Sequence, residues 1–264
     1  MAGLPPPPAG THGPQGHYAY GSYAPARPFR PFGGLATAAA ILVGLMALVA
    51  LFGVGAHIRR ANLIDRSFSD GGVSFDELSD ADALVGGSAV VYALGVLVVA
   101  AVFITWQHRH AVNAESLAGS SSGLGPGWAI GGWFIPCANW LLPPMQLFGA
   151  SRASDPALAP GAAAGRGRGS PIVVVWAAMF ILGGALVGVG SVRFPDEDEV
   201  GVFSDVEAYA SEAASADRTV AAGFVLLAAA AVLAAVMVRS LSRRQSKRAA
   251  VVAAAAIGGP AGPG

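Results

Sequence analysis

Long apolar runs alternate with charged or turn-forming segments along this chain. The runs 33–56, 83–105, 171–192 and 219–238 contain no Asp, Glu, Lys, Arg or His. Each has at least 20 residues, and a helix of about 20 residues crosses the roughly 30 Å hydrocarbon core of a bilayer. The pattern therefore predicts an all-α, integral, multi-pass membrane protein with four transmembrane helices.

The stretch 125–150, GPGWAIGGWFIPCANWLLPPMQLFGA, is also apolar but cannot be one straight helix. Proline removes a helical hydrogen bond and clashes with the preceding turn, and this stretch contains Pro136, Pro143 and Pro144. It also holds three of the chain's five tryptophans, whose indole rings favour the level where hydrocarbon meets headgroups. We predict a broken element that is re-entrant or lies in the interface, rather than a fifth crossing.

Charge predicts the orientation of the helices. The segments before the first run, between the second and third, and after the fourth together hold 11 basic and 2 acidic residues. The other two loops hold 5 basic and 14 acidic residues. Because Arg and Lys beside a span stay on the cytoplasmic side, both termini are expected in the cytoplasm and the stretch 125–150 on the cytoplasmic face. Arginine-rich, alanine-rich composition indicates a bacterial protein of the cytoplasmic membrane.

The two ends of the chain differ from the membrane domain, which we place at 32–248. Residues 1–31 are rich in Pro, Gly and Tyr and cannot bury enough apolar surface to fold, so they are predicted to be a disordered cytoplasmic tail. They could bind a protein partner, although a solvated tail is the simpler interpretation. Residues 249–264 form an Ala-rich cytoplasmic tail.

A motif of aromatic and polar residues runs from the end of the second span through the broken element. Trp106, Arg109 and Asn113 have the spacing of one helix face. They are followed by the sequence GWAIGGWFIPCAN and by Arg152-Ala153-Ser154. With these motifs the chain resembles the bacterial membrane-protein family called domain of unknown function 4328, common in high-GC Gram-positive bacteria.

The resemblance implies a multi-pass membrane protein and no activity. The family usually shows a proline followed by an aromatic and a basic residue, where this chain has Pro143-Pro144-Met145-Gln146. The residues that we single out from the motif, for structure or for ligand contact, are Trp106, Arg109, Asn113, Gly127, Trp128, Gly131, Trp133, Pro136, Asn139 and Arg152.

Candidate chemistry is sparse. His108 and His110 lie two residues apart and so point to different faces of a helix, which makes a poor metal pair; contact with lipid headgroups is the favoured interpretation. Cys137, the single cysteine, has no histidine near it in sequence and is expected to be a small buried residue. No nucleotide-binding or metalloprotease motif is present, and we expect no enzyme activity, metal, cofactor or nucleic-acid partner.

Two functions stay open for the broken element. Pro136 and Pro143 free backbone carbonyls that Asn139 can satisfy, as expected for a structural or partner-binding membrane module. The same groups could instead line a path for a small solute, as in a passive channel or permease. Cations beyond the fourth span could in addition contact anionic lipid; they are Arg239, Arg243, Arg244, Lys247 and Arg248.

Overall fold

The computed structural model describes residues 28–69, 72–119, 123–194 and 206–257. Most of the tail 1–31 and the last seven residues lie outside this part of the chain. The described residues contain helices and no strand. Four helices are long and apolar enough to cross a membrane, as predicted; they are α1 (Gly34–Ser69), α2 (Phe75–Ala118), α5 (Pro171–Arg193) and α6 (Val206–Ile257).

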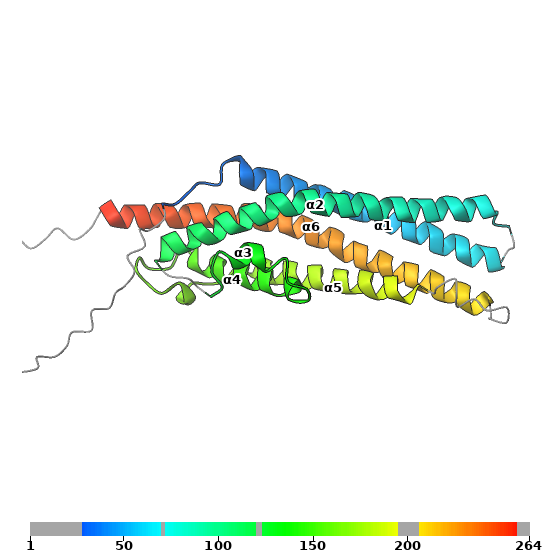
Figure 1. Cartoon of the computed structure of the whole chain (residues 1–264). Coiled ribbons are helices and arrows are strands. Elements are labelled where there is room, and N and C mark those ends of the chain that lie inside the picture. The colour runs from blue at the N-terminus through cyan, green and yellow to red at the C-terminus, as the bar shows by residue number, and fades with distance from the viewer. Residues whose placement is uncertain (1–27, 70–71, 120–122, 195–205, 258–264) are drawn as a thin grey trace, which may run out of the picture.

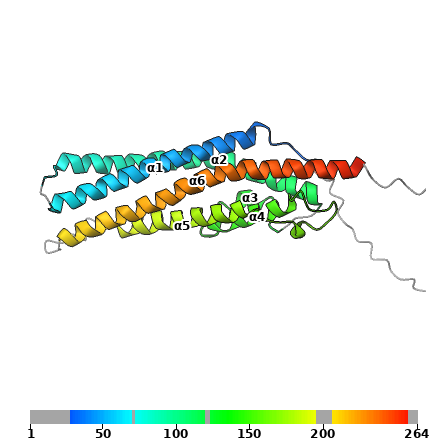
Figure 2. The ribbon, with the colours of Figure 1, turned by 180° about the vertical axis from the view of Figure 1, so that it is seen from behind.

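The four long helices run side by side (Figure 1). Helix α6 is central, because it packs against α1 on one side and α5 on the other, while α2 packs mainly on α1. The start of α1 and the end of α6 point to the same end of the bundle, called here the terminal end, where α6 extends beyond α1 (Figures 1 and 2). The opposite end, where α1 turns into α2, is called the hairpin end.

The helices extend well beyond the apolar runs. Helix α1 continues through the segment that follows run 33–56, and α6 begins 13 residues before Thr219 and continues to Ile257. Ser74 caps α2: its hydroxyl accepts a hydrogen bond from the Glu77 N–H, and the Glu77 carboxylate accepts one from the Ser74 N–H. Such a capping box satisfies two backbone donors that a helix start leaves unpaired. Where the structure describes them, the charged segments at the hairpin end are therefore largely helical.

Glycine brings α5 and α6 into close contact. A Cβ atom at Gly183 would lie 3.0 Å from the backbone oxygen of Gly223, and one at Gly223 would lie 2.7 Å from the oxygen of Gly183. Gly190 likewise lies against the backbone of Ala216. Small residues that let backbones approach are typical of helix packing in membranes, and the glycines at these positions permit this contact.

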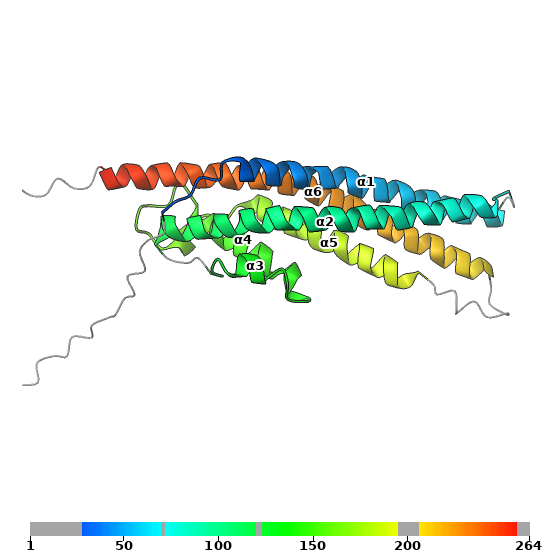
Figure 3. The same cartoon turned by 45° about the horizontal axis from the view of Figure 1, so that its top comes forward.

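The stretch between α2 and α5 forms short pieces: α3 (Trp128–Gly131), the 3₁₀ turn η1 (Ala138–Trp140), α4 (Leu142–Ala153) and the 3₁₀ turn η2 (Ala164–Arg166). Helix α4 spans only about 18 Å at 1.5 Å per residue, so none of these pieces is long enough to cross a bilayer on its own. Helix α4 contacts both α2 and α5 and closes the bundle between them towards the terminal end, with α3 outside it (Figure 3).

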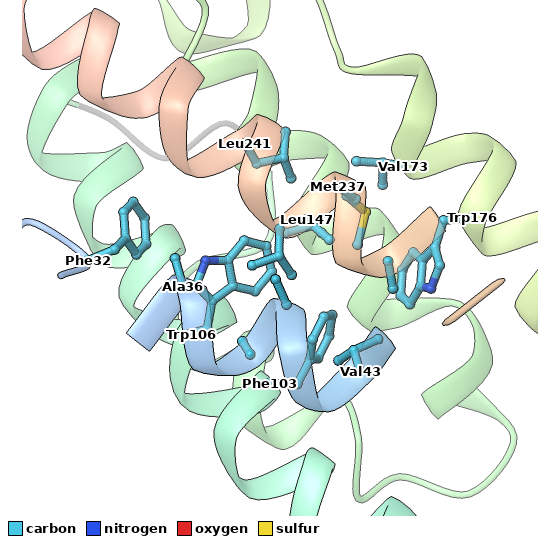
Figure 4. Packing of buried hydrophobic residues seen from close by; sticks show 14 of the residues in the cluster. Phe32, Ala36, Val43, Phe103, Trp106, Leu147, Val173, Trp176, Met237 and Leu241 are labelled. Atoms are coloured by element: carbon cyan, nitrogen blue, oxygen red, sulfur yellow. The ribbon is translucent and has the colours of Figure 1, made fainter. Parts of the chain in front are cut away.

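The main core lies where α4 meets the long helices (Figure 4). Trp106 of α2, Leu147 of α4 and Met237 and Leu241 of α6 are fully buried there. Phe103 bridges them to Trp176 of α5, with ring centroids 6.0 Å apart. The broken element is thus part of the core, and its removal would expose large aromatic side chains.

Candidate functional site

Three of the ten motif residues, Trp106, Asn113 and Trp133, meet at one place, where α2, the broken element and the last third of α6 come together. We call this place the polar junction. It consists of Trp106, Gln107, His110, Asn113, Trp133, Gln146, Ser154, Ser242 and Gln245.

Trp106 and Asn113 occupy the face of α2 that the spacing predicts, and both are buried. The Trp106 indole N–H donates to the Ser242 hydroxyl at 3.0 Å. The Asn113 amide exchanges two hydrogen bonds with the backbone of Arg30, at 2.7 and 3.0 Å. These contacts fix the chain entering α1 and the end of α6 against α2. Arg109, between them in the motif, is half-buried.

Gln107 is the central residue of the junction and is completely buried. Its amide N–H₂ donates to the Pro143 carbonyl at 3.1 Å and to the Gln146 side-chain oxygen at 3.0 Å. Its own side-chain oxygen accepts the indole N–H of Trp133 at 3.1 Å. A carbonyl beside the paired prolines thus receives its donor from Gln107. Gln146, which stands where the family usually has a basic residue, also bonds to Gln107.

The first half of the broken element is a series of tight turns. The Gly127 carbonyl accepts the Gly131 N–H at 2.9 Å, and the Pro136 carbonyl accepts the Ala138 N–H at 2.7 Å. Trp128 and Gly131, both in the first of these turns, are exposed. The turns direct apolar side chains outward, away from the core.

Cys137 differs from its expected role. Its side chain is exposed, not buried, and its backbone has φ of +62°, which costs a residue with a Cβ about 1–2 kcal/mol. The sharp reversal before η1 turns this side chain out of the packed element, and nothing in the residue composition signals such a reversal.

Asn139 and Trp140 follow in η1. The Asn139 side-chain oxygen is buried and accepts no hydrogen bond from the residues that the structure describes. The Trp140 ring stacks near Phe180, with centroids 5.2 Å apart, and covers Gly184, where a Cβ would lie 2.1 Å from the ring. Because Gly184 has no side chain, the Trp140 ring can pack directly on α5 at this position.

The two histidines differ in environment, as their spacing predicts. The ring of His108 contacts the Pro126 carbonyl at 3.1 Å through Nδ1. His110 is completely buried and stacks on Phe32, with centroids 6.2 Å apart. It does not contact headgroups, contrary to our interpretation, because Phe32 and Trp106 cover it. Its ring nitrogens bond to no described residue.

The end of α4 completes the junction. Arg152 donates from Nε to the Gly167 carbonyl at 3.2 Å and so fastens the loop that leads to α5. The hydroxyl of Ser154 accepts the side-chain N–H of Gln245 at 2.9 Å, and the same amide donates to the His110 carbonyl at 3.0 Å. Residues from three helices therefore share one hydrogen-bonded network.

An apolar cavity of about 160 Å³ lies beyond the junction, towards the middle of the bundle. All four long helices line it, and Trp133 of the broken element lies at its wall. Its other lining side chains include Met46, Tyr92, Phe103 and Phe180. Such a lining suits hydrocarbon, and it offers few partners to an ion or a polar solute.

A second buried polar group lies at the hairpin end, and no motif in the sequence indicates it. Asp217 of α6 has a side chain only 1% exposed. Arg60 of α1 donates to both of its oxygens at 2.7 Å, and His57 Nδ1 lies 2.7 Å from one of them. Arg60 also reaches Asp82 at 3.0 Å. We call these four residues the ion cluster.

Neither polar region has the composition of a metal centre. No group of three or more His, Cys, Asp or Glu side chains able to hold a metal occurs among the described residues. The junction is built from amides, indoles and hydroxyls that bond to one another, an arrangement that joins helices.

The chain matches the family model described as domain of unknown function (DUF4328) over residues 69–243. That match covers about two thirds of the chain, so the protein belongs to this family, and the resemblance inferred from the motifs is confirmed. No curated protein and no solved structure matches the chain.

Proposed function

Starting from membership of this family, we propose that the protein is a non-enzymatic, partner-binding module of the bacterial cytoplasmic membrane. Both termini are cytoplasmic, and the broken element is re-entrant in the cytoplasmic leaflet. The charge distribution along the sequence supports this orientation. The observation that carries the function is the outward-facing apolar surface of the broken element.

The depth of the broken element supports a re-entrant placement. Trp140 rests on Gly184, which lies about 20 Å along α5 from Pro171 at 1.5 Å per residue. If α5 crosses the bilayer, Trp140 lies well inside the hydrocarbon. The Trp140 ring packs against α5 there, and irregular backbone at membrane depth is tolerated where protein covers it.

The outer side of the element supplies the contact surface. Phe134 and Met145 are 73% and 60% exposed. Trp128, Ile135 and Leu141 are also exposed on this short segment. Aromatic and methionine side chains are enriched where proteins bind one another. Here they are held on a scaffold whose inner side is fixed by Gln107 and Trp133.

A photo-crosslinking amino acid at Phe134 tests this surface in cells. We expect a discrete higher-mass protein adduct, and none from the same amino acid at Val90, an exposed position on α2. Equal labelling at both positions would mean that the element contacts only lipid, and the proposal would fail.

A small-solute permease is the second candidate, favoured by one observation: the buried side-chain oxygen of Asn139 has no partner among the described residues. Purified protein in liposomes should then conduct a solute, and Asn139→Leu should abolish the flux. The module proposed here predicts no flux above empty liposomes.

A cysteine in place of Arg166, an exposed residue of η2, tests the orientation in a Cys137→Ala background, because Cys137 lies only three residues from Trp140 and a reagent confined to water would not reach it there. An impermeant maleimide should label this cysteine in inverted vesicles and not in intact cells. Labelling from outside alone would place the broken element in the opposite leaflet and reverse the assignment of the termini.

A further inference from the structure

The cations that follow the fourth apolar run fall into two groups. Arg244 forms an ion pair with Asp155 at 3.2 Å and donates to the Arg168 carbonyl. Arg248 is completely buried and donates to the carbonyls of Leu158 and Ala159. These two side chains fasten the loop after α4 to α6, so their charged groups are used in contacts within the protein and not in contacts with a ligand.

The other three cations form an exposed stripe. Arg239, Arg243 and Lys247 lie four residues apart, so they follow one another on the same face of α6 at steps of about 6 Å. All three are exposed, and none makes an ion pair with a described residue. Helix α6 carries no acidic residue after Asp217, so their charge is not neutralised along the helix.

The stripe borders a hollow. Arg239, Ser240, Arg243, Arg244 and Lys247 line a surface depression of about 520 Å³, which Pro156 and Val236 close on two sides. The carboxylate of Asp155 nearby already accepts the N–H groups of Arg168 and Ala157 and pairs with Arg244. The depression is therefore positively charged and has donors available for an anion.

The same face of α6 becomes apolar just before the stripe. Val225, Val232 and Val236 are about half exposed, and their spacing of seven and four residues places them in line with Arg239 and Arg243. Figure 2 shows the middle part of α6 between α1 and α5, with its last part extending beyond both. An apolar strip that leads into a cluster of cations matches a phospholipid beside a helix, with acyl chains on the valines and the phosphate at the arginines.

We propose that this face of α6 is a binding site for one anionic phospholipid, with the headgroup phosphate held by Arg239, Arg243 and Lys247. The strip of valines selects a membrane lipid over free phosphate, because a soluble anion gains nothing from apolar contact. The site needs α6 to cross the bilayer, and it does not depend on partner binding by the broken element.

The test uses the full chain in non-ionic detergent, with bound lipid counted by native mass spectrometry. Phosphatidylglycerol should bind at least tenfold more tightly than phosphatidylcholine. The triple variant R239Q/R243Q/K247Q should lose about 100-fold in affinity for phosphatidylglycerol, and R243Q alone about fivefold.

The matched control is R59Q/R66Q/R193Q, which removes three exposed cations at the hairpin end and so changes the net charge equally. It should retain lipid affinity. Unchanged binding by the triple variant, or equal loss in the control, would overturn the site. Two further competitors are glycerophosphoglycerol, which is the headgroup without acyl chains, and inorganic phosphate. If either one displaces the lipid at equal concentration, the site binds anions without lipid specificity, and the proposal is rejected.

Discussion

The two buried polar regions of this bundle use different chemistry. The ion cluster at the hairpin end is centred on one buried carboxylate, that of Asp217. Three nitrogen atoms, two from Arg60 and one from His57, surround this carboxylate. The polar junction at the terminal end instead joins neutral groups: Gln107 bonds to an amide, an indole and a backbone carbonyl, and the hydroxyls of Ser242 and Ser154 bond to Trp106 and Gln245. A buried charge that loses its partner costs far more than a neutral group that does. The hairpin end should therefore be sensitive to single substitutions, and the terminal end should tolerate paired ones.

The largest effect is expected from Asp217→Ala. It leaves Arg60 and His57 without their buried partner, and breaking a buried ion pair costs about 3–5 kcal/mol. The measurement is the free energy of unfolding in micelles titrated with a denaturing detergent. Asp65→Ala is the control, because its pair with Arg218 is about half exposed and such pairs contribute at most about 1 kcal/mol. Equal losses would contradict the assignment of Asp217 as a buried anchor.

A smaller loss, about 1–3 kcal/mol, should follow Gln107→Leu, because Trp133, Gln146 and Pro143 would each lose a neutral hydrogen-bond partner. The same unfolding measurement applies. The double variant Q107L/Q146L should be more stable than Q107L, since one unpaired polar group is removed with its partner. If the double variant is the less stable one, the junction does not behave as a network of neutral pairs.

Gly184→Ala tests whether the broken element is seated on α5. The new methyl group would meet the ring of Trp140, and such overpacking costs about 1–2 kcal/mol. Gly188 has open space at its Cβ position, so Gly188→Ala should be neutral or stabilising by about 0.5–1 kcal/mol. Tryptophan emission would report displacement of Trp140 in the first variant. Identical behaviour of the two variants would place Trp140 elsewhere.

The smallest effect concerns the ion pair at the terminal end. Burial alone would raise the pKa of Asp155, but the N–H groups of Arg168 and Ala157 and the Arg244 guanidinium hold that pKa below its ordinary value of 3.8. The resulting stabilisation is present above pH 3.8 and is lost as the pH falls through the lowered pKa of the folded state.

Asp155→Asn should therefore reduce the loss of unfolding free energy between pH 5 and about pH 2. Circular dichroism during acid titration of both proteins is the measurement. A larger acid sensitivity in the variant than in the parent protein would mean that folding raises the pKa of Asp155, contrary to the contacts described above.

The sequence predicted the membrane architecture because hydrocarbon imposes a length and a composition on each span. It also predicted that 125–150 is broken, since proline acts locally. It could not predict the pairing of Arg60 with Asp217, because these residues are 157 positions apart and both lie in segments that looked like solvated loops. The role of Gln107 could not be predicted either. A glutamine beside a transmembrane helix is common, and the sequence does not identify its hydrogen-bond partners.

The wrong expectations share this cause. Cys137 was expected to be buried and His110 to contact headgroups, because burial was judged from neighbouring residues in sequence. A positive φ turns Cys137 outward, and Phe32, which lies 78 positions earlier in the sequence, covers His110. Which side of a short turned segment faces the core depends on packing from distant elements.

Helix α6 has a mechanical consequence for the whole molecule. It carries both Asp217 and Gln245 without interruption, about 42 Å apart along its axis. Because a hydrogen-bonded helix resists stretching, it acts as a stiff rod between the two membrane surfaces. A force that shifts Asp217 along this axis must also move Gln245. A displacement at one end of α6 is therefore transmitted to the other end without transport of a solute.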